Sequence, residues 1–153
     1  MATFEEYKFF GEWIQDLSDR RRAASQTYLT VNTAIFTVLA FLFKDAGFHG
    51  WGLVLVSLPL FLAGVMACLI WHKLILEFKE IIGWHYEQLR EMETILPDCS
   101  QTFTKQWKTF YEPGLSKGRY SLSRLEIWLP RSFLGLYGVY CLGLVAAALA
   151  GWM

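Results

Sequence analysis

Three long stretches of this sequence contain no charged residue, and they constrain the fold more than any other feature. Residues 28–43, 53–70 and 133–153 are sixteen, eighteen and twenty-one residues long. A helix of roughly 17–25 apolar residues crosses the ~30 Å hydrocarbon core of a bilayer, and the first stretch reaches that length if the polar residues before it lie in the headgroup layer. Because only 18% of the 153 residues are charged, we predict an all-α polytopic membrane protein with three transmembrane helices.

The positive charges are distributed unevenly around these stretches. Of the fourteen Lys and Arg residues, four lie in residues 1–27, nine in residues 71–132, and only Lys44 between the first two stretches. The positive-inside rule therefore predicts a cytosolic N-terminus and a C-terminus on the outer side of the membrane. Five basic residues are expected at the inner lipid headgroups, where they set the topology: Arg20, Arg21, Arg22, Lys73 and Arg131.

This topology divides the chain into four segments. We predict an N-terminal cytosolic amphipathic helix over residues 1–27, a transmembrane hairpin over 28–70 with spans 28–43 and 53–70, a cytosolic helical segment over 71–132, and a third transmembrane helix over 133–153. Apolar residues recur at alternating three- and four-residue steps in the first and third segments, which predicts a cytosolic helical bundle formed by long extensions of the spans. The expected seam of the bundle consists of Phe10, Ile14, Leu17, Phe78, Ile82, His85 and Leu89.

The cytosolic part carries three further predictions. We expect a face of acidic residues that is solvated or salt-bridged between subunits, made of Glu77, Glu80, Glu87, Glu91 and Glu93. A short helix over residues 100–111 presents an aromatic patch without an obvious intrachain partner, made of Phe103, Trp107, Phe110 and Tyr111. Pro130 is expected to kink or restart the chain before the third span. His85 has two open interpretations, a hydrogen-bonded seam residue or a pH-sensitive contact in an oligomer.

The predicted spans contain small and polar residues that favour close helix packing in lipid. In the third span these form a ladder of small residues on one face, made of Gly143, Ala147 and Gly151. In the first span Thr33 and Thr37 lie near one face, and Asn32 requires a hydrogen-bond partner, so we expect an interhelical hydrogen bond there. Both sets are compatible with contacts between subunits and with packing inside one chain.

Several motifs together resemble the RipA family of small octameric inner-membrane proteins. These are the run Asp19–Arg22 followed by Tyr28–Ala34, a short outer turn to a second span, a long helical inner segment, and the run Leu125–Pro130 leading into a final span. The resemblance implies a ring-like homo-oligomer of eight copies in the cytoplasmic membrane. The layout also looks like the SLATT-type membrane effectors of nucleotide-triggered defence systems, although those typically carry two spans.

The sequence lacks the motifs of an enzyme. It contains no nucleophile elbow, no phosphate-binding loop and no spacing typical of metal ligands, so we predict a non-enzymatic protein without a cofactor. The expected partners are membrane lipid, further copies of the same chain and an unidentified cytosolic partner or ligand. Nucleic acid is not an expected partner. The predicted role is a membrane scaffold or channel-like assembly. The alternative is a pore-forming or membrane-disrupting effector controlled through the cytosolic helices.

Overall fold

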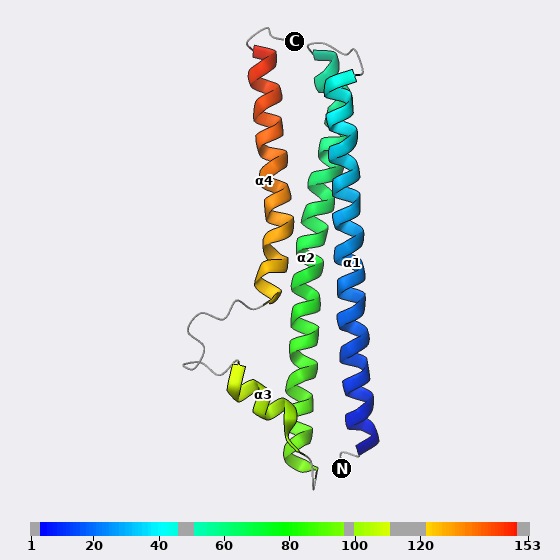
Figure 1. Cartoon of the computed structure of the whole chain (residues 1–153), viewed down its shortest axis with the longest axis vertical. Helices are drawn as coiled ribbons and strands as arrows, with labels where there is room; N and C mark the ends of the chain where they lie inside the picture. Colours follow the sequence, from blue (N-terminus) through cyan, green and yellow to red (C-terminus); the bar gives the residue numbers. More distant parts are fainter. Residues whose placement is uncertain (1–3, 46–50, 97–99, 111–121, 150–153) are drawn as a thin grey trace. The chain divides into compact units, whose positions relative to one another are not determined.

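The computed structural model describes residues 4–45, 51–96, 100–110 and 122–149, and these residues form four helices (Figure 1). The helices are α1 (Phe4–Asp45), α2 (Trp51–Ile95), α3 (Thr102–Phe110) and α4 (Leu122–Leu149). Three of them, α1, α2 and α4, are long and apolar enough to cross a membrane. The predicted all-α fold class with three transmembrane helices is therefore confirmed.

Helices α1 and α2 run through the predicted spans and their extensions without interruption. Glu5 and Glu6 in the first turn of α1 and Lys44 in its last turn complement the helix dipole. Pro59 lies inside α2, where it removes one backbone donor. A membrane helix tolerates this loss because neighbouring helices and small local adjustments satisfy the freed carbonyl group.

Helix α4 differs from the sequence-based expectation at its beginning. The helix α4 continues through Pro130, so the chain does not restart there. The candidate membrane span within α4 begins at Glu126, ahead of the predicted start at residue 133. Pro130 is itself fully buried. The pyrrolidine ring is therefore enclosed by neighbouring side chains.

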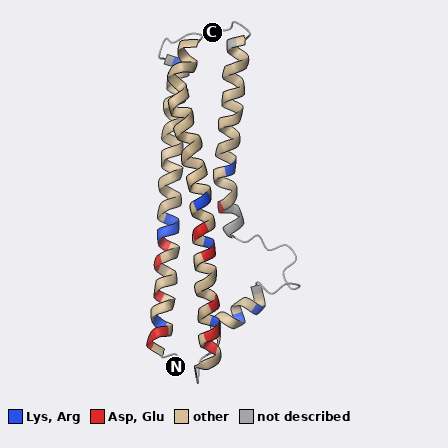
Figure 2. Ribbon diagram, turned by 180° about the vertical axis from the view of Figure 1, so that it is seen from behind, with Lys and Arg blue, Asp and Glu red and all other residues tan. Residues whose placement is uncertain are grey.

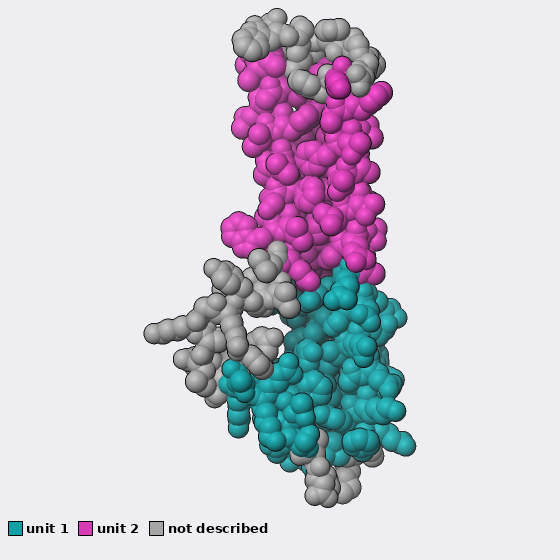
Figure 3. All heavy atoms as spheres, in the orientation of Figure 1, with its two compact units in different colours: residues 1–22, 76–125 teal, residues 23–75, 126–153 magenta. Residues whose placement is uncertain are grey.

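The chain divides into two compact units (Figure 3). Unit 1 comprises residues 1–22 and 76–125, and unit 2 comprises residues 23–75 and 126–153, so α1 and α2 each contribute to both. The core of unit 1 is formed by Ile14, Ile82 and Leu89. In unit 2 the buried side chains of Leu39, Cys68 and Tyr137 join α1, α2 and α4.

The two units differ sharply in charge. Unit 2 holds no charged residue in α1 between Arg22 and Lys44, and none in α2 before Lys73. Figure 2 shows the corresponding ribbon stretches free of blue and red, whereas the parts of α1 and α2 in unit 1 carry many charges of both signs. Unit 2 is therefore the part of the protein suited to hydrocarbon, and unit 1 is suited to water.

Candidate functional site: buried polar centres and exposed faces

A polar centre in unit 2 joins three helices at one side chain. Asn32 of α1 is fully buried, and its Nδ2 donates to the backbone oxygen of Tyr28 over 2.8 Å. Its Oδ1 accepts hydrogen bonds from the hydroxyl of Tyr137 on α4 and from the thiol of Cys68 on α2, both at 3.1 Å. An amide oxygen has two lone pairs, so both are engaged within one protomer.

Tyr137 reaches Asn32 because α2 lacks a side chain where the tyrosine ring lies. A Cβ at Gly64 would overlap the ring and the hydroxyl of Tyr137. The ring also stacks on Phe36 with 4.4 Å between centroids and meets Phe61 edge-on at 5.9 Å. Sequence reasoning missed Gly64 and Tyr137 as a pair, although a tyrosine inside a span needs a partner for its hydroxyl and Asn32 was the obvious acceptor.

The other packing residues predicted in the spans lie outside this centre. The hydroxyls of Thr33 and Thr37 donate to the carbonyl groups of Leu29 and Thr33, four residues earlier, and both side chains are exposed. Gly143 is exposed, and a Cβ added there would meet no atom within 4 Å, while Ala147 is half-buried. Gly151 lies outside the described residues. The protomer thus leaves the threonine face of α1 and Gly143 uncovered.

In unit 1 the structure brings the predicted seam together. Ile14, Ile82 and Leu89 form the buried cluster. The half-buried side chains of Phe10, Leu17 and Phe78 pack against it. His85 is buried beside this cluster, and its Nδ1 lies 2.8 Å from the carbonyl oxygen of Ile81. Because a carbonyl only accepts, Nδ1 carries the proton in this hydrogen bond.

Glu93 has a different role from the one predicted. It was expected on a solvated or salt-bridged acidic face, but its side chain is only 1% exposed. Its Oε1 accepts from the Phe103 amide and the Tyr7 hydroxyl, both at 2.9 Å, and its Oε2 accepts from the Thr104 amide at 2.8 Å and the Thr104 hydroxyl at 2.7 Å. The carboxylate therefore caps the N-terminus of α3, where backbone donors lack partners within the helix.

The electrostatics of Glu93 follow from these contacts. Burial by itself raises the pKa of the carboxyl group, because it disfavours the charged form. The hydrogen bonds from Thr104, Phe103 and Tyr7 favour the ionised form and outweigh burial, so the pKa of Glu93 lies below its ordinary value. Just before α3, Gln101 adopts a left-handed backbone with φ of 49°, which turns the chain so that the first amides of α3 face this carboxylate.

The aromatic residues of α3 also differ from the expectation. They were predicted to lack an intrachain partner, but Phe103 packs against Tyr7 at 6.1 Å and Tyr86 at 5.8 Å between ring centroids. The guanidinium carbon of Arg90 lies 4.0 Å from the centroid of the Trp107 ring. The side chains of Phe110 and Tyr111 lie outside the described part. Since α3 is amphipathic, its apolar face covers one flank of the α1–α2 pair of unit 1.

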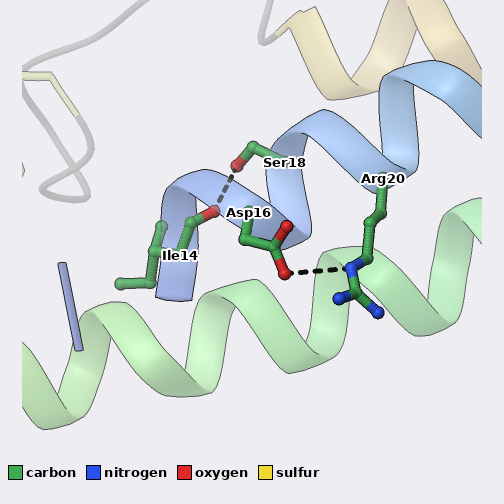
Figure 4. A network of polar contacts seen from close by, with 4 residues as sticks. All are labelled: Ile14, Asp16, Ser18 and Arg20. Carbon is green, nitrogen blue, oxygen red and sulfur yellow. Dashed lines mark hydrogen bonds and ion pairs between the residues drawn. The ribbon is translucent and has the colours of Figure 1, made fainter. Parts of the chain in front are cut away.

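The predicted headgroup residues lie in several environments. Arg20 pairs with Asp16 of the same helix at 2.9 Å, and the hydroxyl of Ser18 donates to the Ile14 carbonyl in the adjacent turn (Figure 4). Such an exposed pair four residues apart contributes about 0.3–0.5 kcal/mol, so Arg20 remains available to other anions at little cost. Arg22, Lys73 and Arg131 are exposed, and Arg21 is half-buried.

These features define a polytopic α-helical membrane protein with a second, charged helical unit, and its candidate sites are packing centres and uncovered faces. The chain belongs to the octameric membrane protein family (8xMP), whose model matches residues 4–147. The match covers nearly all of the described helices and confirms the expected octameric membrane family. No curated protein and no solved structure matches the chain.

Proposed function

We propose that the protein is a non-enzymatic bacterial inner-membrane protein that assembles into a closed homo-octameric ring enclosing a channel-like passage. The N-terminus lies in the cytosol and the C-terminus in the periplasm, in agreement with the distribution of Lys and Arg. Family membership supports the oligomer. The proposed passage depends on one feature of the protomer, a polar stripe on the exposed side of α1.

This polar stripe contains Gln26, Thr30, Thr33, Thr37 and Lys44. Steps of four, three, four and seven residues place these side chains on one side of a helix, and all five are exposed. Elsewhere in unit 2 the exposed side chains are mainly large and apolar, including Leu55 at 67%, Val139 at 69% and Leu142 at 72%. In a ring the apolar faces suit lipid and neighbouring spans, and the polar stripe suits the interior.

The threonine hydroxyls are compatible with a narrow or intermittently hydrated passage. Those of Thr30, Thr33 and Thr37 each donate to a backbone carbonyl of their own helix at 2.8–3.0 Å. Each hydroxyl oxygen keeps acceptor lone pairs that point away from that bond. The stripe can therefore contact water without leaving an unsatisfied donor when water is absent.

Cysteine accessibility in proteoliposomes tests this function. In a background with Cys99 and Cys141 replaced by serine, and with buried Cys68 retained, we expect Thr37→Cys to react with a charged, water-soluble thiol reagent. The matched control is Val38→Cys, which lies at the same depth on an apolar part of α1. Native mass spectrometry of the same preparations is expected to give the mass of eight chains. If both cysteines are equally protected from the reagent in an intact octamer, the proposed passage is contradicted. The role as a membrane scaffold then remains.

A further inference from the structure

The two flanks of the helix pair in unit 1 are covered unequally. Helix α3 covers the flank that carries Tyr86 and Arg90 through Phe103 and Trp107. Ile81 lies nine residues before Arg90 on α2. At about 100° per residue this is about two and a half helical turns, so Ile81 points to the opposite flank. On that opposite flank no part of the described chain takes the position that α3 has on the first.

The uncovered flank carries large apolar side chains. Phe9 is 55%, Trp13 46%, Ile81 45% and Trp84 53% exposed. They form a continuous surface, because the ring of Trp13 contacts Phe9 at 5.4 Å and His85 at 5.8 Å, and Trp84 contacts His85 at 4.9 Å between centroids. We call Phe9, Trp13, Ile81 and Trp84 the aromatic flank. Contiguous exposed apolar patches of this kind mark interaction sites.

Lipid is a poor occupant for the aromatic flank. Between the predicted end of the second span and Trp84, α2 carries Lys73, Glu77, Lys79 and Glu80. Inserting the flank into hydrocarbon would bring these charges with it, at a cost of roughly 2.5–3.5 kcal/mol for each buried charge. Close to the flank, Glu80 precedes Trp84 by one turn and is exposed, and its carboxylate would repel an anionic headgroup surface.

The flank on the side of α3 carries a groove whose lining includes groups that bind aromatic side chains. An open groove of about 450 Å³ lies between α2 and α3, lined by two cations, Arg90 and Lys108, together with Trp107, two carboxylates and two threonines. Arg90 already lies over the Trp107 ring of its own chain, so Lys108 is the cation of this groove that the face of an incoming indole ring can bind. The indole N–H needs an acceptor, such as the Glu91 carboxylate in the groove. A protruding tryptophan from another molecule is therefore compatible with the chemistry of the groove.

We propose that the aromatic flank of one subunit docks into the α2–α3 groove of the next subunit, with Trp84 as the inserted side chain. This inference rests on the proposed function, in which the protein forms a homo-octamer. It assigns the contact that unit 1 makes between adjacent subunits of that octamer. The contact is heterologous, since the two surfaces lie on opposite flanks of the same helix pair. Repetition of a heterologous contact closes a ring when the rotation between subunits allows it, which agrees with an octameric family.

Disulfide formation between differently tagged, co-expressed subunits tests the contact. All chains carry Cys99→Ser and Cys141→Ser. We expect a cross-linked dimer when Trp84→Cys chains are mixed with Lys108→Cys chains. Trp84→Cys chains alone should give no dimer, because the two Trp84 side chains do not meet in a heterologous contact. Trp84→Cys mixed with Glu12→Cys should also give none, since Glu12 is exposed on a different face of α1.

Native mass spectrometry of the same samples separates the two proposals. An octamer with the Trp84–Lys108 cross-link supports both. An octamer without this cross-link, or with a cross-link in Trp84→Cys chains alone, overturns the assigned contact and leaves the octameric assembly standing. A monomer in mild detergent overturns both. Because Trp84 is about half exposed, its replacement leaves the core of unit 1 intact, and circular dichroism of the purified variants confirms this before cross-linking.

Discussion

Replacing Gly64 with alanine should destabilise unit 2 by about 2–4 kcal/mol. The new Cβ would overlap the ring and hydroxyl of Tyr137, and the ring cannot simply rotate away because Phe36 and Phe61 hold it on two sides. Overpacking of a well-filled core costs about 1–3 kcal/mol. Displacement of the Tyr137 hydroxyl from Asn32 adds the loss of an interhelical hydrogen bond, on average about 0.6 kcal/mol in a membrane protein.

The matched control is Gly138→Ala in the same membrane unit. A Cβ at Gly138 meets nothing within 4 Å, so alanine should be neutral there or stabilise the helix by up to about 1 kcal/mol. Both variants are unfolded in mixed micelles by titration with sodium dodecyl sulfate, at equal protein concentration, and followed by tryptophan fluorescence. The free energy of unfolding should fall for Gly64→Ala and stay level or rise for Gly138→Ala.

A double-mutant cycle identifies the source of the penalty. With Tyr137→Ala in the background, the added methyl group at Gly64 has no ring to displace, so its cost should fall close to zero and the coupling energy should equal most of the single-variant penalty. A cost that persists without the Tyr137 ring would refute the argument. So would equal penalties at Gly64 and Gly138.

Three further outcomes are expected. A reporter fused after Met153 should behave as periplasmic and one inserted at Gly114 as cytosolic, because thirteen of the fourteen basic residues fall on one side of the predicted topology. Leu89→Asp should lower the stability of unit 1 by several kcal/mol in a thermal melt, because it places a charge in an apolar cluster, whereas exposed Glu80→Ala should change it little. Glu93→Gln should accelerate amide exchange in α3 by about 10–100-fold, as expected for hydrogen bonds to a charged group worth about 1.5–3 kcal/mol, with Glu80→Gln as the unchanged control. Folding lowers the pKa of Glu93. The ionised carboxylate therefore stabilises the fold fully at pH values above the pKa that Glu93 has in the unfolded chain, and this stabilisation is lost as the pH falls through the lower pKa of Glu93 in the folded protein.

The spans and the seam of unit 1 were predictable because their signals are local. A long uncharged stretch and a repeat of three and four residues each depend only on the geometry of one helix. Ile14, Ile82 and Leu89 accordingly lie where the repeat places them. No knowledge of a partner helix is needed to find such positions.

Glu93 was assigned wrongly because its environment depends on a separate helix. After Leu89 the repeat can continue by three residues to Met92 or by four to Glu93, and hydrophobicity alone favours Met92. The structure half-buries Met92 and fully buries Glu93, because the first amides of α3 and the hydroxyl of Tyr7 supply the donors that a buried carboxylate requires. The ten-residue separation in sequence gives no periodic signal for that contact.

Asn32 bears on a question that the sequence left open, whether polar groups in the spans join helices of one chain or different subunits. Both lone pairs of its Oδ1 are used by Tyr137 and Cys68 of the same chain, and its Nδ2 donates to Tyr28. A subunit contact through this oxygen would have to break one of these bonds, so it would gain little. The polar centre therefore joins the three helices within each protomer, and the surfaces that the protomer leaves uncovered are the ones open to assembly. In the described part of unit 2 these surfaces are mainly apolar or small, apart from the polar stripe of α1 and exposed charged residues such as Lys73 and Arg131. In the proposed ring, the apolar surfaces would contact lipid and neighbouring subunits, and the polar stripe of α1 would face the passage.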